Sequence, residues 1–189
     1  FRSVLFAMIL CIPLVAGVEV GDKPEYKFPT EQGLLTSDML KGRIVVIDFW
    51  ATWCPPCVKA MPHMKKIHKE KSSQGVVVLG ISRDKNIDKM KKFCEDRGYD
   101  WPQCVDKDAS DKLARQFGIS GIPSIFIMAP NGELLWKGHP SRMDKPLDDA
   151  IKKYRAQIAR AMRQDRSNRN KPQPLNEKTL AQANETLDR

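Results

Sequence analysis

Two cysteines separated by two prolines are the residues of this chain that most directly suggest chemistry. They lie in Trp53-Cys54-Pro55-Pro56-Cys57, after a strand-like apolar run and before a helix-like segment. A Cys-x-x-Cys pair at the start of a helix is typical of a redox dithiol, because the helix N-terminus favours a negatively charged sulfur. The pattern predicts thiol–disulfide exchange, with Cys54 as nucleophile and Cys57, one turn into the helix, as resolving thiol.

A second motif further along the chain, Gly121-Ile122-Pro123-Ser124, is predicted to complete the same site. A cis Pro123 would expose the backbone of Ile122 for strand-like pairing with a bound peptide, whereas an ordinary trans loop proline would not. We expect Trp53 to shield the dithiol and to offer a substrate an apolar contact, while Trp50 belongs to the core. Ile122, Pro123 and Trp53 are therefore the predicted substrate contacts.

Asp48 is the polar exception in the apolar run 44–50, shortly before Cys54. A buried, unpaired carboxylate costs several kcal/mol, so such an acid beside a dithiol indicates a functional role. The alternative is a strand end whose side chain faces the surface.

A metal site is the main competing interpretation of the two thiols. A structural zinc ion needs four ligands, and the sequence has no second Cys-x-x-Cys pair. His63 and His68 are five residues apart, which places them poorly for a shared metal on one helix. We therefore expect neither a metal nor a cofactor.

The composition is that of a soluble globular protein, with 41% hydrophobic and 29% charged residues among 189. The net charge of +9 is spread along the chain without a dense basic run. Because no zinc-knuckle or RNA-recognition motif accompanies this charge, we expect no nucleic-acid partner. A basic solvated surface with loose attraction to acidic partners or anionic lipid is the preferred interpretation.

The N-terminal segment resembles a secretory signal. Residues 4–18 are mostly apolar, too short for a comfortable transmembrane helix, and 15–17 offer small residues for cleavage. We expect 1–17 to be a cleaved signal peptide or an uncleaved anchor, and the protein to be periplasmic or to face the periplasm from the membrane. The four cysteines outside this segment fit an oxidising compartment. Cys94 and Cys104 are either a second disulfide or buried small residues.

Strand-like and helix-like segments alternate along the chain, which predicts an α/β fold around a central mixed sheet flanked by helices. The segment 18–41 is expected to contain only short turns. We expect strands over 44–50, 76–81, 122–128 and 133–137, and helices over 57–71, 84–97, 110–117 and from 144–146 onward.

These motifs carry a family resemblance. The stretch 48–57 is similar to the active-site segment of the thioredoxin superfamily, 118–124 to its cis-proline loop, and Asn131-Gly132 to its hairpin turn. The motif Ala-Thr-Trp-Cys-Pro-Pro-Cys resembles that of the exported TlpA/ResA-like branch. The resemblance covers about residues 20–155. We therefore divide the chain into the N-terminal segment, a thioredoxin-like domain over 18–163, and a polar basic tail over 164–189 that is expected to be disordered.

The resemblance also implies roles. Asp48 matches the buried acid that relays a proton to or from Cys57, and Pro55 and Pro56 support the dithiol. Pro56 and Ile122 resemble the reducing branch, which implies an enzyme that reduces disulfides in exported partner proteins and draws on an unidentified electron donor. Two alternatives stay open, a copper- or haem-delivery module and a peroxiredoxin-like peroxidase, although this chain departs from the cysteine spacing of both families.

Overall fold

The computed structural model describes residues 17–169. The expected signal or anchor segment therefore lies outside the described residues, apart from Gly17.

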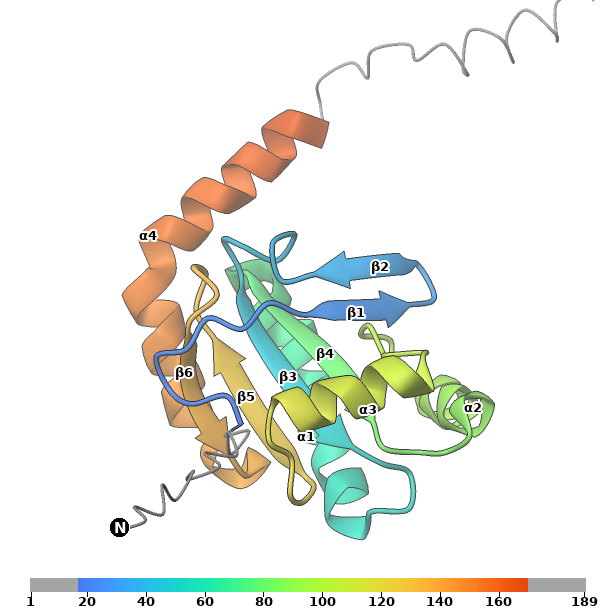
Figure 1. Cartoon of the computed structure of the whole chain (residues 1–189). Helices are drawn as coiled ribbons and strands as arrows, with labels where there is room; N and C mark the ends of the chain where they lie inside the picture. The colour runs from blue at the N-terminus through green and yellow to red at the C-terminus, as the bar shows by residue number, and fades with distance from the viewer. Residues whose placement is uncertain (1–16, 170–189) are drawn as a thin grey trace, which may run out of the picture.

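A four-stranded mixed sheet forms the centre of the fold (Figure 1). Its strands are β3 (Ile44–Trp50), β4 (Val76–Ser82), β5 (Ser124–Met128) and β6 (Leu134–Gly138), in the order β4-β3-β5-β6. β3 runs parallel to β4 and antiparallel to β5, and β6 returns antiparallel to β5. This arrangement confirms the predicted mixed sheet, since a helical crossover joins the parallel pair β3–β4 and a tight turn joins the antiparallel pair β5–β6.

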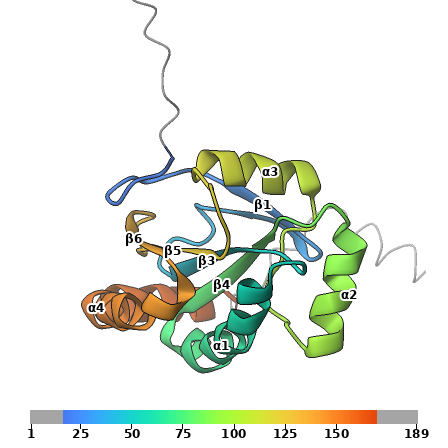
Figure 2. The same cartoon turned by 90° about the horizontal axis from the view of Figure 1, so that it is seen from below.

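Helices cover both faces of this sheet. Figure 2 shows α1 (Pro55–Lys71) and α4 (Asp144–Arg169) on one face, and α3 (Lys107–Gln116) with the hairpin of β1 (Lys27–Thr30) and β2 (Gly33–Thr36) on the other. The remaining helical elements are α2 (Ile87–Arg97) and the short 3-10 turns η1 (Ser72–Gln74) and η2 (Pro140–Arg142).

β3 is buried along its whole length and supplies side chains to two cores. Val46 and Trp50 join the core under α1 and α4, whereas Ile47 and Phe49 join the core under α3 and the hairpin. Because side chains alternate along a strand, Asp48 projects toward the face that α1 covers.

The N-terminal segment differs from the prediction. Instead of turns alone, it forms an antiparallel hairpin of β1 (Lys27–Thr30) and β2 (Gly33–Thr36). Phe28 is fully buried beneath it. Each strand has four residues, and β1 contains Pro29, so the alternation of apolar and polar residues is too short to predict a strand. Burial of the hairpin against α3, and not local sequence preference, therefore stabilises it.

Three helix starts differ from the prediction: α1 begins at Pro55 and not at 57, and α2 and α3 each begin after a polar cap. Asn86 accepts a hydrogen bond from the Lys89 amide at 2.9 Å, so α2 begins at Ile87 and not at residue 84. Asp106 accepts one from the Ala109 amide at 2.7 Å, so α3 begins at Lys107 and not at 110. In both cases the cap satisfies an amide that would otherwise lack a partner at the helix start.

The predicted disordered tail begins too early, because α4 continues through Arg169. Two glycine turns let this helix lie close to the domain: a Cβ on Gly42 would lie 2.4 Å from Ala161 Cβ, and one on Gly75 would lie 2.2 Å from Ile158 Cγ2. Asp165 forms an ion pair with Arg43 one turn later. This ion pair ties Asp165 to the domain, whereas residues 170–189 of the predicted tail lie outside the described residues.

Candidate functional site

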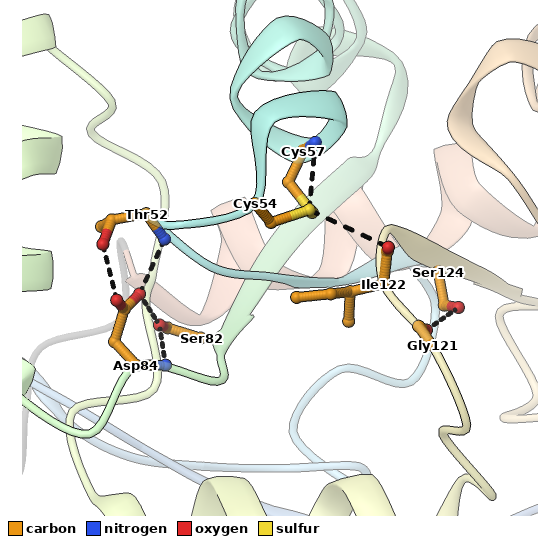
Figure 3. Close-up of a disulfide and its surroundings, with 8 residues drawn as sticks. All are labelled: Thr52, Cys54, Cys57, Ser82, Asp84, Gly121, Ile122 and Ser124. Atoms are coloured by element: carbon orange, nitrogen blue, oxygen red, sulfur yellow. Dashed lines mark hydrogen bonds between the residues drawn. A yellow bond between two sulfur atoms is a disulfide. The ribbon is translucent and has the colours of Figure 1, made fainter.

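The cysteine pair forms a disulfide at the first turn of α1. Cys54 is the N-cap residue, and Pro55 and Pro56 occupy the first helical positions, where an amide hydrogen would have no helical partner. The S–S distance between Cys54 and Cys57 is 2.07 Å. The Cys57 amide donates to Cys54 Sγ at 3.3 Å (Figure 3). The same amide and the helix dipole would stabilise a Cys54 thiolate after reduction.

The second motif faces this disulfide. The carbonyl oxygen of Ile122 lies 3.8 Å from Cys54 Sγ, and the Ile122–Pro123 peptide bond is cis, as predicted. Ser124 Oγ donates to the Gly121 carbonyl at 2.7 Å, which fixes the start of β5 (Figure 3). A side chain added at Gly121 would meet no atom within 4 Å, so the approach to the loop is open there. The fold thus brings the two sequence motifs into contact.

Asp48 is buried, with 3% of its surface exposed. Loss of solvent around the carboxyl group raises its pKa to about 7. The alternative of a strand end facing the surface is therefore wrong. Its neighbours on the same strand face, Val46 and Trp50, belong to the core cluster that also contains Cys57.

The two tryptophans beside the site have opposite surroundings. Trp53 is 62% exposed, next to the disulfide, whereas Trp50 is fully buried. Trp50 donates its indole N–H to Gln103 Oε1 at 3.1 Å and packs against Phe93. Trp50 is therefore a core residue as predicted, and Trp53 is placed where a docking partner could contact it.

Asp84 is a site residue that the sequence interpretation missed, because it was assigned to the start of a helix. Its carboxylate accepts hydrogen bonds from the Thr52 amide at 2.9 Å and the Thr52 hydroxyl at 2.6 Å (Figure 3). The sequence signal for this site is the polar run Ser82-Arg83-Asp84 at the end of the buried strand β4. This strand runs parallel to β3, the strand that precedes Cys54. Carboxyl ends of adjacent parallel strands lie at the same sheet edge, where ligands and reactive groups gather.

Cys94 and Cys104 are both free thiols. Of the two open interpretations, the structure has the buried small residues and not the second disulfide. Burial raises the pKa of the Cys94 thiol to about 12, and burial also raises the pKa of the Cys104 thiol. Both sulfurs therefore stay protonated and weakly nucleophilic near neutral pH.

The histidines form separate surface contacts. His63 pairs with Asp144 at 2.7 Å, and His139 is exposed and contacts Ser141 at 2.9 Å. Across residues 17–169, no group of three or more His, Cys, Asp or Glu side chains is arranged to hold a metal ion. Within the same range, no helix combines the length and apolar character needed to cross a membrane.

Comparison with known proteins matches residues 21–137 to the family model described as the AhpC/TSA family. The chain is 28% identical over 114 residues to a thiol-disulfide oxidoreductase ResA from Bacillus thuringiensis (strain Al Hakam), covering 60% of this chain and 65% of that protein. It is 30% identical over 108 residues to a ResA from Halalkalibacterium halodurans, covering 57% and 60%. The chain thus matches less than two thirds of the length of either relative.

Solved structures show the same fold. The chain superposes with a TM-score of 0.61 on a thiol:disulfide interchange protein of the thioredoxin family from Chlorobium tepidum, at 25% identity over 72% of this chain and 99% of that one. The thioredoxin domain of a thiol-disulfide oxidoreductase from Bacteroides vulgatus gives a TM-score of 0.62 at 24% identity, covering 73% and 99%. The predicted thioredoxin-like fold is therefore confirmed.

Proposed function

The chain belongs to the AhpC/TSA family, and we propose that it is a thiol–disulfide oxidoreductase that uses Cys54 and Cys57 to reduce disulfides in partner proteins. The observation that carries this proposal is the placement of Cys54 as the N-cap of α1, with the Cys57 amide directed at its sulfur at 3.3 Å. This geometry stabilises the anionic sulfur that exchange requires. The ResA relatives, which carry the name thiol-disulfide oxidoreductase, give independent support.

The reaction consists of two exchanges. In the reduced protein, the Cys54 thiolate attacks one sulfur of the partner disulfide, forms a mixed disulfide and releases the other partner sulfur as a thiolate. The Cys57 thiolate then attacks Cys54 Sγ, so that the second partner sulfur leaves and the Cys54–Cys57 disulfide forms. The partner gains two electrons and two protons, and an electron donor must later reduce the disulfide again.

Asp48 is proposed to accept the proton that Cys57 must lose before the second exchange. Burial raises the pKa of this carboxyl group to about 7, which is suited to proton transfer at neutral pH. Its place on the strand face covered by α1 supports the role, because Val46 and Trp50, its neighbours on that face, belong to the core cluster that contains Cys57.

Partner docking is proposed at the surface formed by Trp53, Ile122 and Pro123. The exposed indole offers apolar area, and the Ile122 carbonyl beside Cys54 Sγ offers a backbone acceptor to an extended peptide. Pro55 and Pro56 support this surface by fixing the first turn of the helix. Because the segment 4–18 resembles a secretory signal, we place the activity outside the cytoplasm, with the N-terminus as a possible membrane attachment.

Two experiments test the proposal. The first measures insulin reduction by the protein in its reduced form, and the second traps the mixed disulfide between Cys54 and a partner. Cys57→Ser should leave partners covalently attached, visible as high-mass bands that disappear on reduction. Cys54→Ser is the matched control and should trap far fewer, because the nucleophile is gone. Equal trapping by the two variants would reverse the assigned roles.

The same preparation separates the alternatives. A metal-delivery module would trap no partner, and the reduced wild type would bind a metal ion through both thiols with high affinity. A peroxidase would consume peroxide faster than it reduces insulin. We expect insulin reduction to be the faster reaction and to proceed in the presence of a chelator.

A further inference from the structure

The segment between β3 and the cysteine pair is held by one buried carboxylate. Both oxygens of Asp84 are engaged by Thr52: Oδ2 accepts the backbone amide at 2.9 Å, and Oδ1 accepts the hydroxyl at 2.6 Å. Thr52 is two residues before Cys54, and the Cys54 amide closes a turn by donating to the Ala51 carbonyl at 3.2 Å. The position of the N-cap sulfur therefore depends on a segment whose side-chain anchor is Asp84.

Asp84 is itself fixed at the end of β4. Ser82 Oγ donates to Asp84 Oδ2 at 2.6 Å and accepts from the Asp84 amide at 2.9 Å. The Arg83 amide donates to the Trp50 carbonyl at 2.7 Å, which continues the pairing of β4 with β3. Ser110 of α3 donates to the Ser82 carbonyl. The carboxylate is thus built into the sheet edge, with 3% of the residue exposed, and is not a mobile surface group.

We propose that Asp84 is a positioning residue for the dithiol: by holding Thr52 it keeps Cys54 at the N-cap of α1, where the Cys57 amide can stabilise the thiolate. This inference rests on the proposed function, since it concerns the same pair of sulfurs. A carboxylate suits the task because three donors converge on its two oxygens, the Thr52 amide and the hydroxyls of Thr52 and Ser82. An asparagine could accept at only one of those two positions.

Two effects of Asp84 on Cys54 have opposite signs. Its negative charge disfavours a nearby thiolate, whereas its hold on Thr52 favours the thiolate through geometry. Thr52→Val separates them, because it removes only the hydroxyl and keeps both the charge of Asp84 and the backbone amide of Thr52. Loss of positioning should then raise the pKa of the Cys54 thiol.

The test is the pH dependence of iodoacetamide alkylation of Cys54 in the full reduced chain, followed by peptide mass spectrometry. In Thr52→Val, the midpoint should rise by about 0.7 pH unit, and the rate at pH values well below the midpoint should fall about fivefold, the scale of one lost hydrogen bond. Thr52→Ser, which restores the hydroxyl, should return the midpoint to the wild-type value. In an Asp84→Asn background, Thr52→Val should add only part of this shift, because the single acceptor oxygen of asparagine must serve donors that share two oxygens in the wild type.

An unchanged midpoint in Thr52→Val would overturn the proposal, as would an equal shift in Thr52→Ser or a full Thr52→Val shift in the Asp84→Asn background. If Thr52→Val does not fold, Ser82→Ala releases the carboxylate from its other side and should raise the midpoint by about half as much. Alkylation reports only on the sulfur. A wild type that fails to reduce insulin while Thr52→Val still shifts the midpoint would therefore reject the proposed function and keep the positioning role.

Discussion

The two pairs of cysteines in this domain differ in chemistry although all four side chains are buried. Their exposed fractions are 4% for Cys54, 1% for Cys57, 6% for Cys94 and 0% for Cys104. The first two form a disulfide, and the other two remain thiols. Burial therefore does not distinguish a redox pair from inert thiols.

The surroundings of each sulfur account for the difference. Cys54 receives the Cys57 amide at a helix N-terminus, whereas Cys94 Sγ lies 3.9 Å from the apolar Met90 sulfur. Cys104 Sγ lies 3.5 Å from the Asp106 carbonyl, and burial is the main cause that raises the pKa of the Cys104 thiol. Donors directed at the sulfur, and not exposure, indicate which pair can carry exchange chemistry.

The largest expected effect is on turnover. Cys54→Ala should lower insulin reduction by about a thousandfold or more, because no other thiolate can replace the nucleophile. Cys94→Ala and Cys104→Ala should stay within about twofold of wild type, since neither thiol ionises near pH 7. A comparable loss in Cys94→Ala would show that the second pair takes part in electron transfer. The two pairs of cysteines would then no longer differ in chemistry.

Asp48 gives the next effect, on stability. Folding raises the pKa of its carboxyl group from 3.8 to about 7, so the native state favours the protonated acid. This preference contributes fully below about pH 4 and is lost as pH rises toward 7, at a total cost on the order of 4 kcal/mol. The unfolding free energy of Asp48→Asn should therefore rise relative to that of the wild type as pH increases from 4 to 8. Urea unfolding of the oxidised protein measures this difference. A pH-independent difference between the two would contradict the raised pKa.

The same variant is expected to lose activity while it gains stability. If Asp48 relays a proton from Cys57, Asp48→Asn should reduce insulin more slowly than wild type between pH 6 and pH 9. Equal rates across that range would refute the proton relay, and Asp48 would then be a destabilising buried acid with no role in catalysis.

Serine substitutions of the inert thiols should have smaller effects that differ from each other. In Cys104→Ser, the hydroxyl can donate to the Asp106 carbonyl that already accepts from the sulfur. In Cys94→Ser, the hydroxyl would face the Met90 sulfur, which is only a weak acceptor, so its hydrogen bond would be poorly satisfied. Cys94→Ser should therefore lower the unfolding free energy by about 1 kcal/mol more than Cys104→Ser does. Chemical denaturation measures both, and the reverse order would refute this view of the two sites.

The smallest effect on stability is expected at Trp53. Because its side chain is 62% exposed, Trp53→Ala should change the unfolding free energy by only about 0.5 kcal/mol. If it is a docking contact, KM for a protein disulfide should rise severalfold while the alkylation midpoint of Cys54 stays unchanged. A changed midpoint with an unchanged KM would make Trp53 part of the sulfur environment and not of the docking surface.

Short-range patterns predicted where the cysteine pair lies between a strand and a helix. The spacing of Cys54 and Cys57 fits one helical turn, and the apolar run before them fits a buried strand, so both follow from neighbouring residues. The cis bond before Pro123 and the contact of that loop with the dithiol were predicted from the motif Gly121-Ile122-Pro123-Ser124, which also resembles the cis-proline loop of the thioredoxin superfamily. The β1–β2 hairpin was missed because its stability comes from Phe28 of β1, which is buried in a core with residues of α3. Those residues lie far along the chain, outside any short window of sequence.

The alternation of segments and the position of the dithiol before a helix were thus fixed by local chemistry: periodicity, turn residues and helix capping act over a few positions. Three other properties depend on long-range packing. The fold, not the spacing, leaves Cys94 and Cys104 as separate buried thiols, and it pairs Arg43 with Asp165 in the part of α4 beyond residue 164. It also brings Asp84 to Thr52, because parallel pairing of β3 and β4 aligns their carboxyl ends. Such contacts join residues far apart in the chain, and their energies exist only once the core has formed.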